Sequence, residues 1–543
     1  MGWFGGQKLQ TPSNVTRITH AIPCEDKFGS PQVVYYQAGV GTGLGIDDQL
    51  LGGATGSGLA EHIREGYSFL ANNYGSGDLI YLLGFSRGAF TARSLAGLIG
   101  QLGLLNKKGL AYFYEIFEDW EHAGDPDFDG PLFLKNYHDE VTGAQYSLDT
   151  PANVPSRAVE YLREYRVLLQ SLGLMHKAPA RDNPAEEVRI QAVACWDTVG
   201  ALGIPVNPFF QKFFKLPAFL RLKNLRWMDT SLTDNIMNAF QALALDEHRA
   251  PFSPAVWERP EGCKTNLKQV WFPGAHSGIG GGYDDTGSAD ISLAWMMDQL
   301  AGQSSTSTSP KDPEKWIQFD DDFIPYLHQL HRLWHQRNPP FASWAKGALY
   351  KSFKFPVSLL GWINRTPGRY RRLHKKTLKP QHGVRLRDTN ELIHASVRAR
   401  VDLGGAAPVD NPKDWHIWSS LLNLVHTILR RTGKEVYRPA ALKGWLLRDG
   451  HDFHDDVAVN NVHLTQLRGS APWYEWVGDD KHVAKGERLH EDHLGKFELQ
   501  LLHLVTGKEE AEDIEASNRG ADSTANLRRM QERERDARRS ETI

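Results

Sequence analysis

The sequence predicts an α/β fold in which buried strands alternate with helices. Three short apolar runs carry this prediction, at residues 79–83, 188–195 and 267–272, and each ends in glycine or polar residues. Such runs are typical of buried parallel strands. Apolar residues at helical spacing follow the first run. We therefore expect an open, mainly parallel sheet whose functional groups lie beyond the carboxyl ends of its strands.

Composition indicates a globular protein of more than one ordinary domain. The 543 residues are 41% hydrophobic, and the net charge of -3 disfavours bulk nucleic-acid binding. Three cysteines at unrelated spacings form neither a disulfide framework nor a metal pattern, which favours a reducing, cytoplasmic location. The N-terminus lacks a secretion signal and no run approaches 18 apolar residues, so we expect neither export nor a membrane span.

Shifts in composition divide the chain into four parts. A catalytic domain is expected over residues 1–301, and a linker rich in serine and threonine over 302–315. A mainly helical C-terminal extension is expected over 316–505. The charge-dense residues 506–543 predict a solvated helix or a disordered tail.

Ahead of the first apolar run, the sequence predicts a helix at 11–22, a strand at 32–37 and a helix at 58–73. The glycines of the loop at 38–45 alternate, so they never form the G-x-G-x-x-G pattern, and no lysine completes a P-loop. Nucleotide binding is therefore disfavoured. Residues 104–187 predict a helical insertion between core strands.

The first apolar run leads into Gly84-Phe85-Ser86-Arg87-Gly88, the pattern of a nucleophile elbow. A serine on a strained strand-to-helix turn requires small neighbours, and Gly84 and Gly88 supply them. The N–H of Arg87 would donate one oxyanion hydrogen bond. A chance match is the alternative in a chain with 50 glycines. The flanking strand and helix favour a nucleophilic Ser86.

An acid and a histidine follow the other two predicted strands. Asp197 comes after residues 188–195, and His276 lies in a glycine-rich loop after residues 267–272. The order Ser86, Asp197, His276 is that of the α/β-hydrolases. Here His276 would be the general base and Asp197 would orient it. Alternatively, Asp197 caps a turn and His276 is an ordinary loop histidine, and Asp246 and Asp234 compete for the orienting role.

The run Asp246-Glu247-His248-Arg249 is a second candidate cluster. Asp246, Glu247 and Arg249 could hold a substrate group or support His276. A buried arginine–carboxylate pair that fixes the loop is the favoured interpretation, because structural ion pairs often resemble functional clusters.

Four motifs together resemble a known family: GFSRGAFTAR, CWDTVGALG, ALDEHRAPFSP and VWFPGAHSGIGGGY. They are similar to the α/β-hydrolase family formerly of unknown function that includes bacterial type VI secretion phospholipase effectors and is abundant in fungi. TPGRY, TNELIHASVRAR and YRPAALKGW resemble the C-terminal region of fungal members. The resemblance implies lipase or esterase chemistry, with Ser86, Asp197 and His276 at the family's triad positions.

The chain departs from the family pattern in two ways. The apolar strand that ends in Asp-Gly-Thr-Trp is absent ahead of Pro12, so the core sheet is expected to lack its first strand. This loss would expose the edge of residues 32–37 or 79–83 and could remove a second oxyanion donor. Gly278 also stands where the family has aspartate. Either the gene model is truncated or activity is compromised.

Two segments combine basic and aromatic residues. Residues 207–223 contain five phenylalanines, four bases and no acid, which predicts a lid or a contact with anionic membranes, or else a helix packed on the extension. Residues 345–400 suit an anionic interface or a solvated face over a core. The latter set comprises Lys351, Lys354, Arg365, Arg369, Arg371, Arg372, Lys375, Lys376 and Lys379 among Trp344, Phe353, Phe355, Trp362 and Tyr370. The metal-capable residues 451–456 match no metal-site spacing.

These features predict a serine hydrolase that cleaves lipid esters through an acyl-Ser86 intermediate, without a metal or organic cofactor. One rival function is that of a catalytically impaired binding or scaffold protein. The other is an acyltransferase that uses the same elbow. Acyl chain, headgroup and oligomeric state are left open.

Overall fold

The structure is a computed structural model of the whole chain, and part of the chain is described. The described residues are 11–39, 56–123, 130–137, 154–176, 188–199, 232–303, 313–338, 344–352, 362–373, 380–409, 436–449, 474–479, 481–484, 487–506, 511–512 and 514–515.

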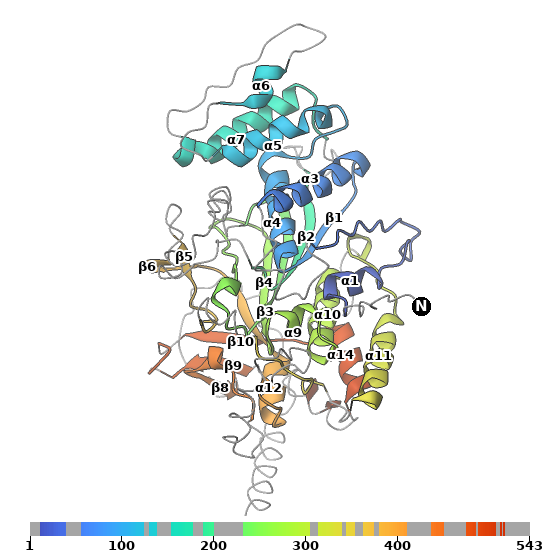
Figure 1. Cartoon of the computed structure of the whole chain (residues 1–543), viewed down its shortest axis with the longest axis vertical. Coiled ribbons are helices and arrows are strands. Elements are labelled where there is room, and N and C mark those ends of the chain that lie inside the picture. Colours follow the sequence, from blue (N-terminus) through green and yellow to red (C-terminus); the bar gives the residue numbers. More distant parts are fainter. Residues whose placement is uncertain are drawn as a thin grey trace, which may run out of the picture.

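An eight-stranded mixed sheet runs through the molecule in the order β1-β2-β3-β4-β7-β10-β9-β8 (Figure 1). The first six strands of this order are parallel, and β9 and β8 complete the sheet in antiparallel pairs. In sheet order the strands span Ile80–Phe85, Ile190–Trp196, Ile236–Ala244, Asn266–Phe272, Glu391–His394, Arg488–Asp492, Tyr474–Gly478 and Trp445–Asp449. A separate hairpin pairs β5 (Arg371–Leu373) with β6 (Pro380–Arg385).

Helices cover both faces of the parallel half of the sheet (Figure 1). One core cluster packs the sheet against α3 (Gly56–Asn73), α4 (Arg87–Leu102), α5 (Phe113–His122), α6 (Leu132–Asn136) and α7 (Val154–Ser171). The other packs it against α1 (Asn14–Thr19), α9 (His276–Gly280), α10 (Gly287–Leu300), α11 (Phe323–Arg337), α12 (Ala395–Asp402) and α14 (Lys496–Val505). Short 3-10 turns span Gly109–Tyr112, Ala250–Phe252, Pro313–Lys315 and Ala440–Leu442. Burial on both faces explains why the strands read as continuous apolar runs.

Most predicted elements are confirmed. The three apolar runs form β1, β2 and β4, and the predicted helices at 11–22 and 58–73 form α1 and α3. Helices α5, α6 and α7 make up the described part of the insertion at 104–187. The strand β3 was not predicted, although it lies between β2 and β4 and its carboxyl end is fully buried.

The predicted strand at 32–37 is wrong. These residues form no strand in the described part of the chain, and Val33 is 76% exposed. The segment is held instead by side chains: Tyr35 stacks on Phe69 of α3, with ring centroids 4.6 Å apart, and the hydroxyl of Tyr36 lies 3.0 Å from that of Thr16. The N–H of Gln32 donates to the carbonyl of Cys24 at 2.8 Å, but no sheet pairing follows it along the run.

The strand β1, which leads into Ser86, lies at the edge of the sheet among the described residues. In the described part of the chain β1 pairs with β2 alone, and no strand lies on its other side. This arrangement leaves the outer N–H and C=O groups of β1 without sheet partners among the described residues.

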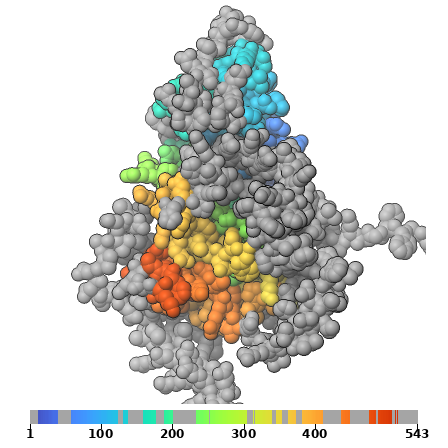
Figure 2. Space-filling model, turned by 60° about the vertical axis from the view of Figure 1, so that its left-hand side comes forward, coloured from blue at the N-terminus to red at the C-terminus, as the bar shows by residue number. Residues whose placement is uncertain are grey.

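The C-terminal extension is mixed rather than mainly helical. It contributes α11, α12 and α14, but also β7, β10, β9 and β8, which continue the sheet from β4. Its apolar strands were not recognised in the sequence because their runs are short. Figure 2 shows residues after about 300, coloured yellow to red, over the lower part of the molecule, with the cyan insertion helices at its top. Among the described helices, none has the length and hydropathy that a membrane span requires.

Candidate active site

Ser86 occupies a sharp turn between β1 and α4. Its φ of 60° and ψ of -121° lie in a region that side chains rarely adopt, as expected for a nucleophile elbow. Ser86 is partly exposed, and its N–H donates to the carbonyl of Trp196 at 3.0 Å. The strained turn thus places Ser86 beside the end of β2, where Asp197 begins the next loop.

The two elbow glycines differ in how much space surrounds them. A Cβ at Gly84 would lie 2.3 Å from the carbonyl oxygen of Gly88, so the turn cannot close with a larger residue there. A Cβ at Gly88 would meet nothing within 4 Å. The expectation that both positions must be glycine is therefore wrong for Gly88. Arg87 is the first residue of α4, at the positive end of the helix dipole.

Asp197 follows directly after β2 and is fully buried. Its Oδ2 accepts a hydrogen bond from Nδ1 of His276 at 2.7 Å, and its Oδ1 accepts from the N–H of Ala244 at 3.2 Å. Asp197 has a φ of 40°, so its backbone is also held in the left-handed region. The predicted acid and base are therefore in direct contact.

His276 begins α9 and is fully buried, rather than lying in a flexible loop as expected. Its ring packs between Phe85 and Phe252, with centroid distances of 4.6 and 4.9 Å. Because Nδ1 contacts Asp197, the proton on that atom leaves the lone pair of Nε2 available. The Nε2 atom has no hydrogen-bond partner among the described residues. It is the atom that accepts a proton from serine in a catalytic triad.

Ser86 and His276 are near each other but are not hydrogen-bonded in this structure. Phe85, the residue before Ser86, packs on the His276 ring. A Cβ at Gly280 would lie 2.0 Å from the Phe85 ring, so that glycine permits this approach. Catalytic hydrogen bonds are often long without substrate. Gly278, the departure from the family pattern, has open space at its Cβ position.

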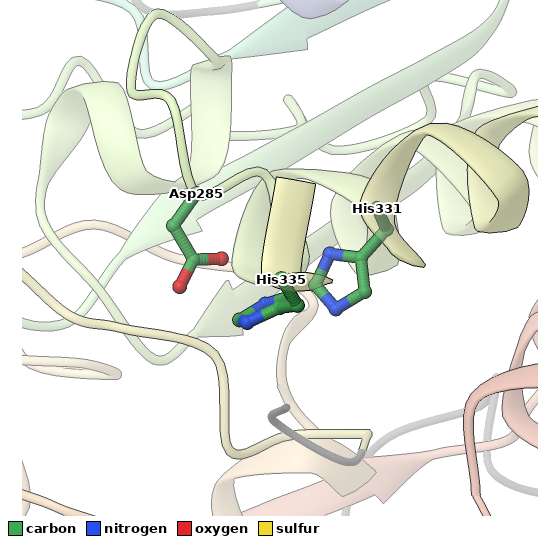
Figure 3. A group of neighbouring side chains, drawn as sticks. All are labelled: Asp285, His331 and His335. Carbon is green, nitrogen blue, oxygen red and sulfur yellow. The ribbon is translucent and has the colours of Figure 1, made fainter. Parts of the chain in front are cut away.

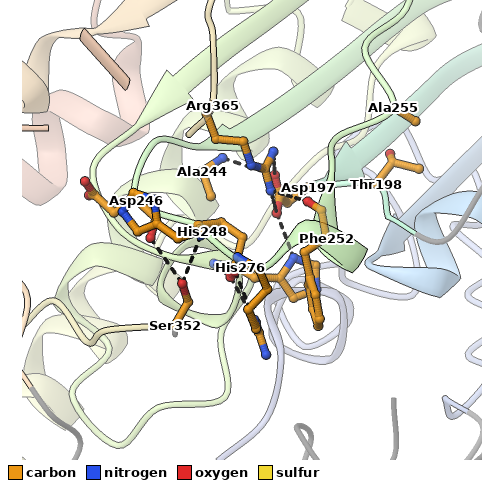
Figure 4. A network of polar contacts seen from close by, with 12 residues as sticks. Asp197, Thr198, Ala244, Asp246, His248, Phe252, Ala255, His276, Ser352 and Arg365 are labelled. Carbon is orange, nitrogen blue, oxygen red and sulfur yellow. Dashed lines mark hydrogen bonds and ion pairs between the residues drawn. The ribbon is translucent and has the colours of Figure 1, made fainter. Parts of the chain in front are cut away.

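Arg365 is a site residue that the sequence did not reveal. Its two terminal nitrogens donate to the two carboxylate oxygens of Asp197 at 3.2 and 3.1 Å, and Nη2 also donates to the carbonyl of Phe252 at 2.7 Å. Asp197 thus lies between Arg365 and His276 (Figure 4). Arg365 was expected in a basic interface, but it is 1% exposed. That expectation is wrong for this residue.

The charge of Arg365 determines the ionisation of Asp197. Burial alone would raise the pKa of Asp197, but Arg365 and then His276 lower it below its ordinary value. In return, burial would lower the pKa of Arg365, and Asp197 together with Glu247 raises it. Asp197 is therefore an ionised carboxylate at neutral pH, although it has no access to water.

A short backbone pairing brings Arg365 to the site. The N–H of Ile363 donates to the carbonyl of His248 at 2.9 Å, and Trp362 stacks on the His248 ring with centroids 4.1 Å apart. Arg365 is three residues after Trp362, and its side chain contacts Asp197. The one sequence feature that could have pointed to a role for Arg365 is its position. It immediately precedes TPGRY, one of the motifs that resemble the family.

The cluster Asp246 to Arg249 supports the histidine. Glu247 forms a buried ion pair with Arg249 at 2.9 Å and accepts a hydrogen bond from the N–H of His276 at 3.3 Å. Burial would raise the pKa of Glu247, but Arg249 lowers it to about 2. The pair therefore fixes the backbone at the start of α9.

The competing acids do not contact His276. Asp246 accepts from the N–H of Gly274 at 2.7 Å and from the hydroxyl of Tyr437 at 2.8 Å, and burial raises its pKa. Asp234 is exposed and precedes β3, at the opposite end of the parallel strands. The geometry thus favours Asp197 over both alternatives.

Several sequence predictions fall outside the described residues. These are the basic and aromatic segment at 207–223, the residues 451–456, most of the linker and most of the tail. Within the described residues, the one group of three metal-ligating side chains close enough to share an ion lies away from this site, at α11.

Parts of this chain are similar to known proteins. Over 140 residues it is 37% identical to the uncharacterized protein YEL023C of Saccharomyces cerevisiae, a match that covers 23% of this chain and 20% of that relative. The chain therefore spans only about a fifth of that relative's length. A solved structure of the Tle1 effector bound to the VgrG spike from the type VI secretion system aligns with 52% of this chain and 42% of its own, at 19% identity and a TM-score of 0.23.

A family model gives the broadest match. The catalytic-domain model of the Tle1-like phospholipase effectors of type VI secretion matches residues 3–299, which is more than half of the 543 residues. At the level of the family, this indicates hydrolysis of lipid esters. The chain belongs to the family of Tle1-like phospholipase effector catalytic domains.

Proposed function

We propose that the protein is a serine hydrolase that cleaves carboxylic esters of phospholipid-type substrates. The contact that carries the proposal is the 2.7 Å hydrogen bond between Asp197 and His276, beside the strained elbow at Ser86. Family membership supports a lipid ester as the substrate class. The roles of the individual residues rest on their geometry.

In the proposed reaction, Nε2 of His276 takes the proton of the Ser86 hydroxyl as Oγ attacks the ester carbonyl carbon. The resulting oxyanion accepts a hydrogen bond from the N–H of Arg87. Collapse of the tetrahedral intermediate breaks the ester bond, and His276 returns its proton to the departing alcohol. Water then attacks the acyl-Ser86 by the same steps in reverse and releases the fatty acid.

Asp197 stabilises the imidazolium that forms twice in this cycle. It remains ionised because Arg365 holds its pKa low, despite burial. Arg365 also fixes the direction of the carboxylate through two parallel contacts. We assign Arg365 as a positioning residue, since it acts through Asp197.

The test is hydrolysis of phosphatidylcholine vesicles by the full chain, measured as release of free fatty acid. Wild type should release fatty acid and Ser86→Ala should not. Ser171→Ala, which removes an exposed serine at the end of α7, is the matched control and should retain full activity. Equal release by Ser86→Ala and wild type would refute the proposal. Transfer of the acyl group to an added alcohol would instead support the acyltransferase.

Residues 207–223 are proposed to contact anionic membranes. Their phenylalanines would be buried in the bilayer, and each nearby base would add about 1 kcal/mol. Liposome co-sedimentation of the double variant Phe213→Asp/Phe214→Asp tests this. Lost binding with intact hydrolysis of a soluble ester supports the contact, whereas unchanged binding assigns these residues to the core.

One observation favours a catalytically impaired binding protein as the second candidate. The nucleophile strand β1 lies at the sheet edge in the described part of the chain, and Ser86 makes no hydrogen bond to His276. This candidate predicts that wild type and Ser86→Ala bind lipid vesicles equally while neither releases fatty acid.

A further inference from the structure

A second group of functional side chains lies away from the triad. Asp285, His331 and His335 are all buried, and each offers a ligand atom within 4.8 Å of the others (Figure 3). Asp285 lies in the loop between α9 and α10, and both histidines belong to α11. No sequence spacing rule detects the group because its aspartate is distant from its histidines in the chain.

The two histidines share one face of α11. Residues four apart lie one turn from each other, so His331 and His335 project side by side. Their ring centroids are 4.3 Å apart, and both are less than 7% exposed. Paired imidazoles at this spacing on one helix face are a common arrangement for holding a metal ion.

Backbone contacts hold Asp285 in place. Its Oδ1 accepts from the N–H of Gly287 at 3.0 Å, and its Oδ2 accepts from the N–H of Ala348 at 3.0 Å. Each carboxylate oxygen has a second lone pair, so these contacts orient the group without using up its capacity as a ligand.

The turn after Asp285 approaches α11 closely. A Cβ at Gly287 would lie 3.2 Å from Oδ1 of Asp285 and 3.3 Å from Cε1 of His331. His331 and Gly287 also line a small, mainly apolar cavity with Trp344, and neither Asp285 nor His335 is among its lining residues. The loop and the helix thus meet closely beside the group.

We propose that Asp285, His331 and His335 bind a divalent transition-metal ion, with Zn²⁺ as the best match, and that a water molecule is its fourth ligand. Two imidazoles and a carboxylate suit zinc, whereas Ca²⁺ and Mg²⁺ prefer oxygen ligands alone. Tetrahedral zinc places its ligand atoms roughly 3.4 Å apart. Small side-chain rotations would bring the group from its present separation to that geometry.

The ion would join two parts of the chain. It would link α11, which follows the predicted linker, to the turn that leads from α9 into α10. His276 begins α9, so the ion would stabilise the segment that carries the proposed base. Its expected role is structural, and it goes beyond the proposed hydrolysis.

The experiment is titration of the full, chelator-treated chain with Zn²⁺ alone, followed by calorimetry. We expect one ion per chain and a rise in the thermal unfolding midpoint, because an ion that binds only the folded state stabilises it. His335→Ala and Asp285→Asn should each weaken binding more than about tenfold, since even indirect partners of a metal contribute that much. Ca²⁺ and Mg²⁺ should not bind.

His328→Ala is the matched control because it removes a histidine of α11 that is not in the group. It should bind Zn²⁺ as wild type does. Equal weakening by His328→Ala and His335→Ala would indicate adventitious imidazole binding and overturn the proposal. If His335→Ala fails to fold, Asp285→Asn decides: wild-type affinity in that variant would also overturn it.

Discussion

Two buried carboxylate–histidine pairs lie in the described part of the chain, and their differences indicate what makes one of them a candidate active site. Asp197 contacts His276 at 2.7 Å, and Glu498 contacts His394 at 2.5 Å. The second pair even has its own serine, since Oγ of Ser396 lies 2.7 Å from Nδ1 of His394. All of these acids and histidines are buried.

The pKa values of the two acids are shifted in opposite directions. Arg365 contacts Asp197 and lowers its pKa against the effect of burial. Burial raises the pKa of Glu498 well above its ordinary value, and the nearby Asp492 raises it further. Burial also lowers the pKa of His394 to about 4. Burial thus disfavours the charged form of both members of the second pair, which makes that pair poorly suited to stabilise an imidazolium.

The backbone around the two serines differs as well. Ser396 is buried at the start of α12, and its N–H donates to Nδ1 of His394, so that histidine serves as a helix cap. Ser86 is partly exposed on a strained turn. A serine, a histidine and an acid in contact are thus insufficient. A charged acid and an accessible serine distinguish the proposed site.

The largest predicted effect separates the two histidines. His276→Ala and Ser86→Ala should each abolish ester hydrolysis, and the double variant should be little worse, because residues that act as a unit are non-additive. His394→Phe should keep its activity, since its ring stacks on Phe272 rather than facing substrate. Steady-state rates on a soluble ester measure this. If activity were lost in His394→Phe but kept in His276→Ala, the active site would have to be assigned to the His394 pair instead.

The next effect separates the two acids. Asp197→Asn should lower kcat by roughly 10⁴-fold and retain some activity, as amide replacement of a triad acid favours the wrong histidine tautomer. Glu498→Gln should change kcat less than about threefold, because Glu498 contacts His394 and Gly495 and takes no part in the proposed reaction. Kinetics of both variants decide. Wild-type rates for Asp197→Asn combined with an inactive Asp246→Asn would show that the acid is assigned wrongly.

A smaller effect is expected at Arg365. Arg365→Gln should lower kcat roughly tenfold to a hundredfold through misplacement of Asp197, with KM unchanged. It should also move the acidic limb of the kcat/KM profile to higher pH, since loss of a positive charge raises the pKa of its neighbours. Arg365→Lys restores the charge but not the two-point contact. It should therefore restore the pH profile and only part of the rate.

An Arg365→Gln variant with normal pH dependence and a raised KM would assign Arg365 to packing alone. Circular dichroism of each variant distinguishes that outcome from unfolding. Ser171→Ala again provides the baseline rate for a variant far from the site.

The sequence predicted the proposed site better than it predicted the sheet. Ser86, Asp197 and His276 were found because each follows a recognisable apolar run, and the ends of parallel strands meet at one edge. The strand β3 was missed because no turn residue separates its apolar run from the acidic cluster that follows it. Residues 32–37 were misassigned because composition alone cannot show whether a neighbouring strand is present.

Long-range partners were beyond the reach of local patterns. Arg365 lies 168 positions from Asp197, and several other bases follow it in the sequence. Nothing in its local sequence distinguishes a buried arginine from a solvated one. The strands of the extension were missed for a similar reason, because β7 becomes recognisable only through its pairing with β4.

The smallest predicted effect concerns stability at the second pair. His394 has a pKa of about 4 in the folded chain, below its ordinary 6.5. Its contribution to stability is complete above about pH 6.5 and is lost as pH falls toward 4, because the unfolded imidazole takes up a proton first. Relative to His394→Phe, wild type should lose about 2 kcal/mol between about pH 7 and pH 5. Urea unfolding at both pH values measures it, and a constant difference would contradict the assignment.

Labelling with a fluorophosphonate probe tests the central claim most directly. The probe reacts only with a serine activated by an assembled base, so peptide mass spectrometry should locate it on Ser86. His276→Ala should abolish labelling, while His394→Phe and Ser171→Ala should label as wild type does. Absence of label on Ser86 in folded wild-type protein, or undiminished label in His276→Ala, would contradict the account.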